Sequence, residues 1–202
     1  MNIEKIIEEL SLEKESEICE NFYKDERKKN NLRIYLEEMM KTDPKILFVG
    51  EAPGYDGCAI TGIPFTDERI IREYNALPGQ YSVYGCEKEK SAKAVWDVLK
   101  NVEKLPVLWN SFPLHPHRAG NRMTNRTPSV SEKQEVGEKY IRYIIELFNI
   151  EKIYAIGVQA FDMLKEMNIK EFDPLRETSY IRHPSHGGQK QCQQKIKEIL
   201  KG

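Results

Sequence analysis

Four short apolar segments interrupt the chain, at residues 46–49, 105–109, 152–157 and 178–181. A short run that is apolar throughout, rather than at every second position, is typical of a strand covered on both faces of a parallel sheet. The stretches between these segments carry apolar residues at helical spacing. Strands alternating with helices predict an α/β fold, with three α/β/α layers around a central four-stranded parallel sheet.

Helical periodicity covers much of the remaining chain. Residues 11–40 predict one or two amphipathic helices, and further helices are expected at 91–102, 161–167 and 191–200. Pro128 followed by Ser129-Val-Ser-Glu132 is typical of a capping box, which predicts a helix from there to residue 148. In the absence of internal repeats, residues 1–202 are expected to form a single domain, with residues 1–42 as a helical extension packed on it.

The charges nearly cancel, because 31 Lys and Arg oppose 32 Asp and Glu, for a net charge of −1. This balance excludes a polybasic coat for nucleic acid but leaves a local cationic groove open. No apolar run approaches the roughly 18–20 residues of a membrane span, and the amino terminus lacks the apolar core of a signal peptide. We therefore expect a cytoplasmic protein with no membrane partner.

The cysteines Cys19, Cys58, Cys86 and Cys192 are isolated from one another in the sequence. None belongs to a C-x-x-C pair, which disfavours a zinc ribbon or a thioredoxin-like redox site. Isolated thiols in a cytosolic chain are usually reduced and structural. The spacing therefore gives no support for a metal site.

Polar loops follow three of the predicted strands. Residues 50–57 (GEAPGYDG) place glycines around Pro53, which lets backbone N–H groups approach a ligand, and add two carboxylates, Glu51 and Asp56. Asn110 ends the second strand, and its amide offers a donor and an acceptor. His183 follows the last strand. Because the carboxyl ends of parallel strands share one sheet edge, we expect these side chains to converge there.

Each of these residues also has a purely structural interpretation. The first loop is equally typical of an ordinary turn, Asn110 of a backbone cap and His183 of a structural histidine. Phe65, in the segment GIPFT at residues 62–66, either stacks on a planar ligand or belongs to the core. The shared position at one sheet edge, more than any single residue, favours a binding site.

Six segments in this order resemble the uracil-DNA glycosylase superfamily, and its iron–sulfur-containing bacterial and archaeal branch is the most similar. They are ILFVGEAPG at 46–54, GIPF at 62–65, LWN at 108–110, NRTPSVSE at 125–132, IYAIGVQA at 153–160 and YIRHPS at 180–185. The resemblance implies a hydrolase of base excision repair. Its reaction would cleave the N-glycosidic bond of uracil in DNA, releasing free uracil and leaving an abasic site.

The resemblance also implies roles for the loop residues. Backbone N–H groups at Glu51 and Ala52 would hold a uracil oxygen, and Phe65 would stack on the ring. Asn110 would pair with the uracil edge and reject cytosine, whose exocyclic amine has the opposite polarity. His183 would donate to the oxygen that gains negative charge as the bond breaks.

DNA phosphates would be bound outside the base pocket. The resemblance gives Ser185 this role, and a basic groove is expected from Arg118, Arg122, Arg126, Arg182 and Lys190, unless acids such as Asp173 and Glu177 neutralise it.

The segment after HPS, residues 186–188 (HGG), offers no large apolar side chain to fill the space left by a flipped base. Single-stranded or mismatched DNA is therefore the more natural substrate, and a uracil-containing duplex remains an alternative.

The protein is expected to be a monomer.

Two residues of the first loop depart from the best-known branch of the superfamily. Ala52 stands where that branch has an aspartate that positions water, and the iron–sulfur branch also has alanine there. This leaves Asp56 and Glu51 to orient water or to balance the sugar cation, and we favour Asp56. Gly54 stands where the classical enzymes have a tyrosine that excludes thymine, so thymine is excluded less strictly or by another residue.

The iron–sulfur branch holds its cluster with an N-terminal C-x-x-C pair and two later cysteines. Here Leu114 and Val136 occupy the later positions, and Cys19 stands alone. We therefore expect no iron–sulfur cluster and no other cofactor.

Two alternatives stay open. The same fold could release another deaminated base such as hypoxanthine or xanthine, because an asparagine can also read a purine edge. A non-catalytic member that binds DNA or a nucleobase is compatible with Ala52 and with the near-neutral charge.

Overall fold

The computed structural model describes residues 1–73, 77, 79–83 and 89–201. A four-stranded parallel sheet in the order β3-β2-β5-β6 forms its centre. The strands are β2 (Ile46–Gly50), β3 (Val107–Asn110), β5 (Lys152–Ile156) and β6 (Tyr180–Ile181). The predicted sheet is thus confirmed, although β3 and β6 each begin two residues later than expected. Gly50 and Asn110 are partners in the register, so β2 and β3 end side by side.

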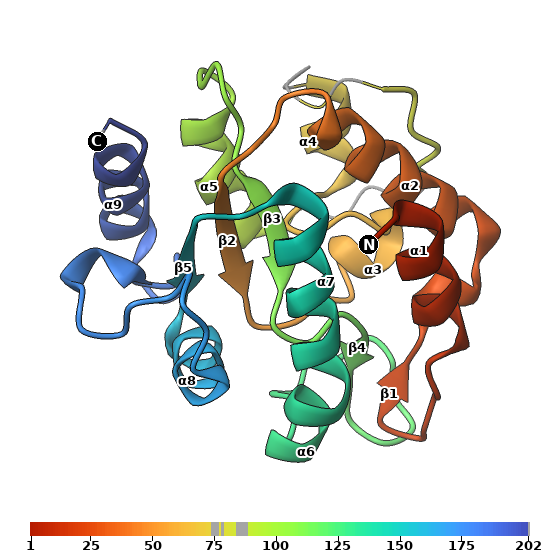
Figure 1. Ribbon diagram of the computed structural model, residues 1–202. Helices are drawn as coiled ribbons and strands as arrows, with labels where there is room; N and C mark the ends of the chain where they lie inside the picture. Colours follow the sequence, from red (N-terminus) through yellow and green to blue (C-terminus); the bar gives the residue numbers. More distant parts are fainter. Residues whose placement is uncertain (74–76, 78, 84–88, 202) are drawn as a thin grey trace.

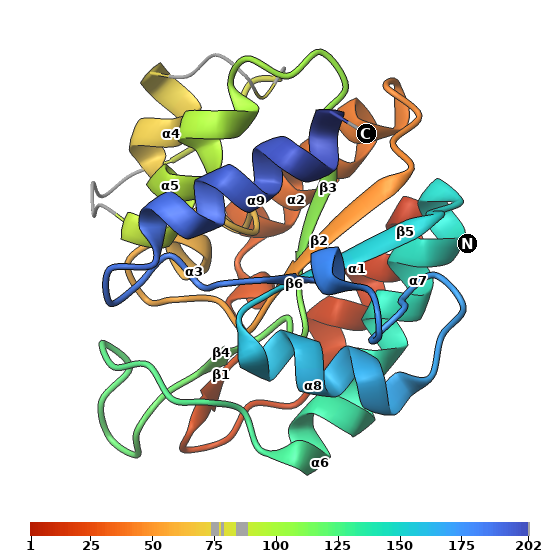
Figure 2. The ribbon, with the colours of Figure 1, turned by 90° about the vertical axis from the view of Figure 1, so that its left-hand side faces the viewer.

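Helices cover both faces of this sheet (Figure 1). Figure 2 looks onto α8 and α9, which lie in front of the sheet, while α1, α2 and α7 lie behind it. The bounds are α1 (Ile3–Leu12), α2 (Glu26–Met40), α3 (Cys58–Thr61), α4 (Glu68–Glu73), α5 (Lys90–Leu99), α6 (Val130–Glu132), α7 (Glu138–Phe148), α8 (Val158–Met167) and α9 (Gln189–Lys201). The three-layer prediction is confirmed. In the described part of the chain, no helix is long and apolar enough to cross a membrane.

Residues 11–40, expected to form one or two helices, contain α2 and only the last two residues of α1. α1 ends at Leu12, and the chain then forms the short strand β1 (Cys19–Glu20) and a 3₁₀ turn (Phe22–Lys24) before α2. Asn21 explains the break, because its side-chain amide donates to the carbonyl oxygens of Leu10 (2.8 Å) and Glu13 (2.9 Å) at the end of α1. Such local side-chain bonds to the backbone compete with a continuing helix.

The predicted capping box is present. The Ser129 hydroxyl accepts from the Glu132 N–H (3.2 Å), and the Glu132 carboxylate accepts from the Ser129 N–H (2.7 Å). The helix then widens into a π-helical turn (Lys133–Gly137) before α7. A Cβ at Gly137 would stand 1.9 Å from the Ser111 carbonyl oxygen, so glycine allows this turn to touch the loop after β3.

The amino-terminal helices share the hydrophobic core of the sheet. Ile6, Leu10 and Leu32 are buried in the same cluster as the strand residues. The Tyr35 hydroxyl of α2 accepts from the Leu108 N–H (2.8 Å) and lies 3.3 Å from the Leu108 carbonyl oxygen. This contact ties α2 to β3, whose far end leads to the functional loops.

Candidate active site

A cavity of about 500 Å³ opens at the carboxyl ends of β2 and β3. It brings together six residues selected from the sequence for catalysis or base binding: Glu51, Ala52, Asp56, Phe65, Asn110 and His183. Residues not selected for such roles complete its wall: Pro53, Gly54, Cys58, Glu89, Lys90, Ser91, Asn125, Arg126 and Thr127. A cavity of this size and mixed lining is typical of a small-molecule or nucleobase site.

The loop after β2 is fixed to the loop after β3. The Ser111 N–H donates to the Gly50 carbonyl oxygen (2.7 Å), and the Ser111 hydroxyl and the Phe112 N–H both donate to that of Glu51 (2.7 and 3.0 Å). These bonds hold Glu51 at the cavity, where its Oε1 is buried without a hydrogen-bond partner among the described residues. A buried carboxylate oxygen without a partner is costly and indicates that a ligand or water satisfies it.

Phe65 forms one wall of the cavity and is nearly buried. The residue therefore belongs to the core and is also placed where a planar ligand could stack on it. Its backbone has a positive φ of 52°, a conformation that costs free energy in a non-glycine residue. The Trp96 indole N–H stabilises it by donating to the Phe65 carbonyl oxygen (2.9 Å). The ring lies against Gly50, where a Cβ would be 2.3 Å from the Phe65 Cζ.

Gly50→Ala is therefore expected to displace the Phe65 ring and to destabilise the fold by about 1–3 kcal/mol, as overpacking does. Thermal unfolding measures the loss of stability. A variant with unchanged stability would contradict the placement of the ring.

Asn110 lines the cavity and is only 4% exposed. Its Oδ1 would be 3.1 Å from a Cβ at Gly50, and its Nδ2 lies 3.9 Å from the Cys58 Sγ. Burial, followed by the charge of Glu89, keeps the pKa of the Cys58 thiol well above its ordinary value, so Cys58 is a neutral, weak acceptor. The Asn110 amide is thus held in place while keeping polar atoms for a ligand.

His183 reaches the cavity from the segment after β6. Its Nδ1 accepts from the Ser185 N–H (3.2 Å) and lies 2.7 Å from the Ser185 hydroxyl. Burial, and then the nearby His186, lowers the pKa of His183. The neutral ring with an accepting Nδ1 carries its hydrogen on Nε2, which makes it a donor at the cavity.

Glu89 was not anticipated from the sequence. It precedes α5, and the buried Asp67 carboxylate fixes it there by accepting from its backbone N–H (3.0 Å). The Glu89 Oε2 is buried without a hydrogen-bond partner among the described residues, and a Cβ at Gly57 would be 1.8 Å from it. Burial, and then the charges of Asp56 and Asp67, raise the pKa of Glu89 to about 8. Glu89 is thus a protonated carboxylic acid at neutral pH.

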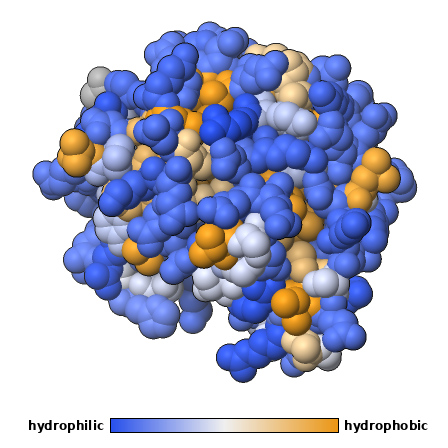
Figure 3. All heavy atoms as spheres, turned by 60° about the horizontal axis from the view of Figure 1, so that its bottom comes forward, coloured by the Kyte–Doolittle hydropathy of each residue, from blue (hydrophilic) through white to orange (hydrophobic). Residues whose placement is uncertain are grey.

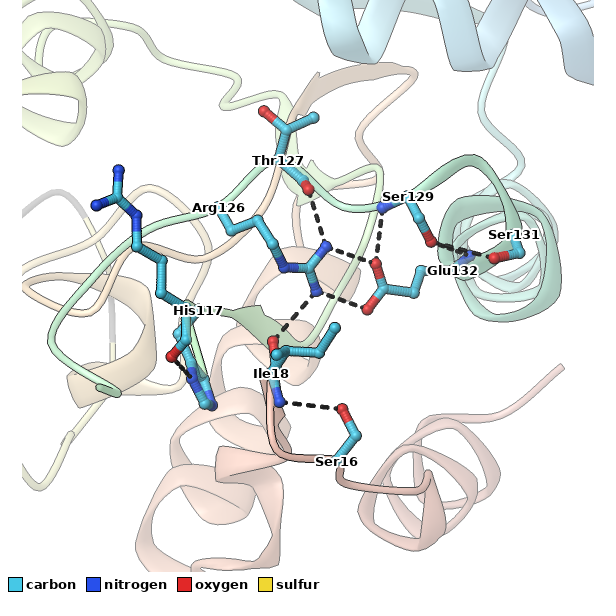
Figure 4. A network of polar contacts seen from close by, with 9 residues as sticks. Ser16, Ile18, His117, Arg126, Thr127, Ser129, Ser131 and Glu132 are labelled. Atoms are coloured by element: carbon cyan, nitrogen blue, oxygen red, sulfur yellow. Dashed lines mark hydrogen bonds and ion pairs between the residues drawn. The ribbon is translucent and has the colours of Figure 1, made fainter. Parts of the chain in front are cut away.

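The residues predicted to bind phosphate lie outside the cavity, except Arg126. Its guanidinium forms two contacts with the Glu132 carboxylate (2.7 and 2.8 Å) and donates to the carbonyl oxygens of Ile18 (3.1 Å) and Thr127 (2.9 Å), as Figure 4 shows. A phosphate role for Arg126 would therefore compete with this ion pair.

Arg118, Arg122 and Arg182 are exposed, and Arg122 pairs with Glu20 (3.3 Å). The acids expected to neutralise the groove have other partners: Asp173 lies near Arg176 (3.8 Å) and Glu177 near Lys195 (3.6 Å). A basic rim beside the cavity therefore stays a prediction.

His115 holds the loops around the cavity together. Its ring is fully buried, with Nδ1 2.8 Å from the Pro53 carbonyl oxygen and Nε2 2.9 Å from that of Arg122. His115→Ala would leave a void and remove the ring that contacts the carbonyl oxygens of Pro53 and Arg122, so we expect a loss of about 2–4 kcal/mol in unfolding free energy. Urea unfolding tests this, with His117→Ala as the control. Equal losses in the two variants would contradict the bridging role of His115.

The described residues do not fit an iron–sulfur cluster. Cys19, Cys58 and Cys192 are buried free thiols on three separate elements, β1, α3 and α9. Cys86 lies outside the described residues. Within the part of the chain that the structure describes, no three His, Cys, Asp or Glu side chains gather as metal ligands.

Comparisons with known proteins agree with this architecture. The family model of the uracil DNA glycosylase superfamily matches residues 38–201. Among solved structures, the chain is similar to wild-type SMUG2 of Pedobacter heparinus, with a TM-score of 0.65 and 17% sequence identity. The similarity covers 98% of this chain and 95% of the other, and at this identity it shows a shared fold. No match was found among the curated proteins.

Proposed function

The chain belongs to the uracil-DNA glycosylase superfamily, and from this membership and the cavity we propose that it hydrolyses the N-glycosidic bond of uracil in DNA. One observation carries the proposal. A single cavity holds a buried amide for the base edge, an aromatic wall, a histidine donor and several carboxyl groups. Recognition of a flipped base and cleavage of its bond to the sugar require this combination.

Base recognition rests on Asn110 and Phe65. The flipped uracil stacks on the Phe65 ring, and the Asn110 amide pairs with its edge, with one donor and one acceptor. Backbone N–H groups of the Glu51–Ala52 turn hold a uracil oxygen. Cytosine is rejected because its amine meets the amide with the wrong polarity and leaves buried groups unpaired.

Bond cleavage moves the electron pair of the C1′–N1 bond onto the base. The uracil anion is stabilised by the Nε2–H of His183, which donates to the oxygen that gains charge. The sugar becomes cation-like and is attacked at C1′ by a water oxygen. Asp56, or alternatively Glu51, orients this water, and the water proton passes to the departing base or to solvent through that carboxylate. Free uracil and an abasic site are the products.

DNA is held outside the cavity. Phosphates are contacted by Ser185, which lies beside His183, and by Arg118, Arg122, Arg182 and Lys190, the last at the start of α9. Arg126 contacts a phosphate only if its ion pair with Glu132 is exchanged for that contact. We propose that the chain acts as a monomeric single domain. Within the superfamily, we place it beside the iron–sulfur branch on the sequence GEAPG, without that branch's cluster.

A second candidate function is favoured by Glu89. A carboxyl group with a pKa raised to about 8 is protonated at neutral pH and able to donate a proton or a hydrogen bond. Purine bases leave more readily when such a group donates to them. Hypoxanthine or xanthine in DNA is therefore the alternative substrate.

The test is base release from single-stranded and duplex oligonucleotides that carry one uracil, hypoxanthine, xanthine or thymine, followed by alkaline cleavage at the abasic site. Release of uracil alone supports the proposal, and release of a purine alone supports the second candidate. DNA binding without release of any base would indicate a non-catalytic member of the superfamily. Measuring the iron content of the purified protein tests the absence of a cluster.

A further inference from the structure

The loop of residues 118–125 presents one large apolar side chain to solvent. Met123 is 72% exposed, whereas its neighbours in the loop are basic, polar or small. Exposed Arg118 and Arg122 lie on the same loop. Figure 3 shows the face at the carboxyl ends of the strands as mainly hydrophilic, with separate hydrophobic side chains. Met123 thus forms an apolar tip beside two cations. Duplex DNA is a suitable partner for such a tip, because its stacked bases are apolar and its phosphates are anionic.

The 118–125 loop is held in one conformation by its own hydrogen bonds. The Thr124 hydroxyl accepts from the Arg118 N–H (3.0 Å) and donates to the Asn121 carbonyl oxygen (2.7 Å). The Asn121 side chain accepts from the Met123 N–H (3.0 Å). These bonds fix the backbone on both sides of Met123, so little conformational entropy is lost when the tip binds.

The same loop is attached to the wall of the cavity. Asn125 lines the cavity, and its Oδ1 accepts from the Tyr55 N–H (3.2 Å). His115 links the Arg122 carbonyl oxygen to that of Pro53, another cavity residue. Figure 2 shows the loop after β4 on the same side of the molecule as the segment before α9. That segment carries His186-Gly187-Gly188 and no large apolar side chain, whereas the 118–125 loop carries Met123.

We propose that Met123 inserts into the base stack of duplex DNA and occupies the space left by the flipped nucleotide. Arg118 and Arg122 then contact the flanking phosphates. The Arg122 ion pair with Glu20 is exposed and weak, so it exchanges readily for a phosphate. This inference rests on the proposed glycosylase function and changes the expected substrate, because a chain with such a wedge acts efficiently on duplex DNA.

The experiment compares Met123→Ala and Met123→Leu with the unaltered protein on duplex and single-stranded DNA carrying one uracil. The wedge predicts that Met123→Ala lowers kcat/KM on the duplex about tenfold, while its effect on single strands is about twofold or less. Met123→Leu keeps an apolar wedge and is expected to retain duplex activity. Val130→Ala shortens another exposed apolar side chain, on α6, and serves as the control.

A second readout reports on insertion directly. A 2-aminopurine beside the uracil fluoresces more strongly when the stack is opened, and this rise is expected with the unaltered protein and not with Met123→Ala. Equal losses on both substrates, or no loss on the duplex, would overturn the proposal. If the unaltered protein releases no base from any DNA, the proposed glycosylase function is wrong. The 2-aminopurine signal alone then tests whether Met123 inserts into the base stack. Equal signals from the protein and Met123→Ala then exclude insertion.

Discussion

His183→Ala is expected to lower the rate of uracil release about 100- to 1,000-fold, the usual cost of removing one donor to a developing negative charge. The Ser185 N–H donates to Nδ1, so the neutral ring presents its hydrogen from Nε2 at the cavity. That donor acts mainly in the transition state, where the base oxygen gains charge. The loss is therefore expected in kcat, with DNA affinity changed little.

Single-turnover base release and fluorescence anisotropy with labelled DNA measure the two quantities for His183→Ala. Ser185→Ala retains the backbone donor to Nδ1 but loses the hydroxyl at 2.7 Å, so a smaller loss is expected. His186→Ala removes a neighbouring histidine that lowers the pKa of His183 but does not line the cavity, so its loss is expected to be much smaller than that of His183→Ala. Release by His183→Ala at the normal rate would show that the base leaves without this donor.

Much of the fold could be predicted because its strands are short and mostly buried. Val49, Trp109 and Ile156 lie in segments apolar on both faces, a pattern that few other structures require. The convergence of Glu51, Asn110 and His183 followed from strand direction alone, since parallel strands place their following loops at one edge. The break after α1 could not be predicted from periodicity, because it depends on the amide of Asn21 reaching back to Leu10.

Glu89 shows why the cavity was predicted only in part. It follows no predicted strand, and its position depends on Asp67, which lies 22 residues away in the sequence. Arg126 shows the converse: its residue type suggested a phosphate contact, yet Glu132 occupies its guanidinium. Sequence identifies residues that a local element positions, whereas tertiary partners decide whether their polar groups are available.

Asp56→Asn and Glu89→Gln are expected to separate the roles of the cavity carboxyl groups. The charge of Asp56 helps to raise the pKa of Glu89 to about 8, so Glu89 is a carboxylic acid at neutral pH. Asp56→Asn removes the carboxylate that we propose orients water, and release is expected to fall about 100-fold. Glu89→Gln replaces a neutral acid by a neutral amide, and at pH 7 its rate is expected to stay within about twofold of normal.

The pH dependence distinguishes Glu89 from the other acids. Above about pH 8, Glu89 ionises and adds negative charge next to Cys58, which contacts Asn110. The departing base anion is then less stable, so release by the unaltered protein is expected to fall above this pH, and Glu89→Gln is expected to lack that fall. If Glu89→Gln instead lost base release at pH 7 as strongly as Asp56→Asn, the role proposed for Asp56 would belong to Glu89.

Stability provides a test of the same titration without DNA. Folding raises the pKa of Glu89 from its ordinary value of 4.5, so the folded state binds the proton more tightly than the unfolded chain does. The stabilisation is complete below about pH 4.5 and is lost as the pH rises to about 8. Urea unfolding across this window should show a smaller decline in Glu89→Gln than in the unaltered protein. In Asp56→Asn the decline in unfolding free energy should end at a lower pH. The variant lacks the Asp56 charge, which helps to raise the pKa of Glu89.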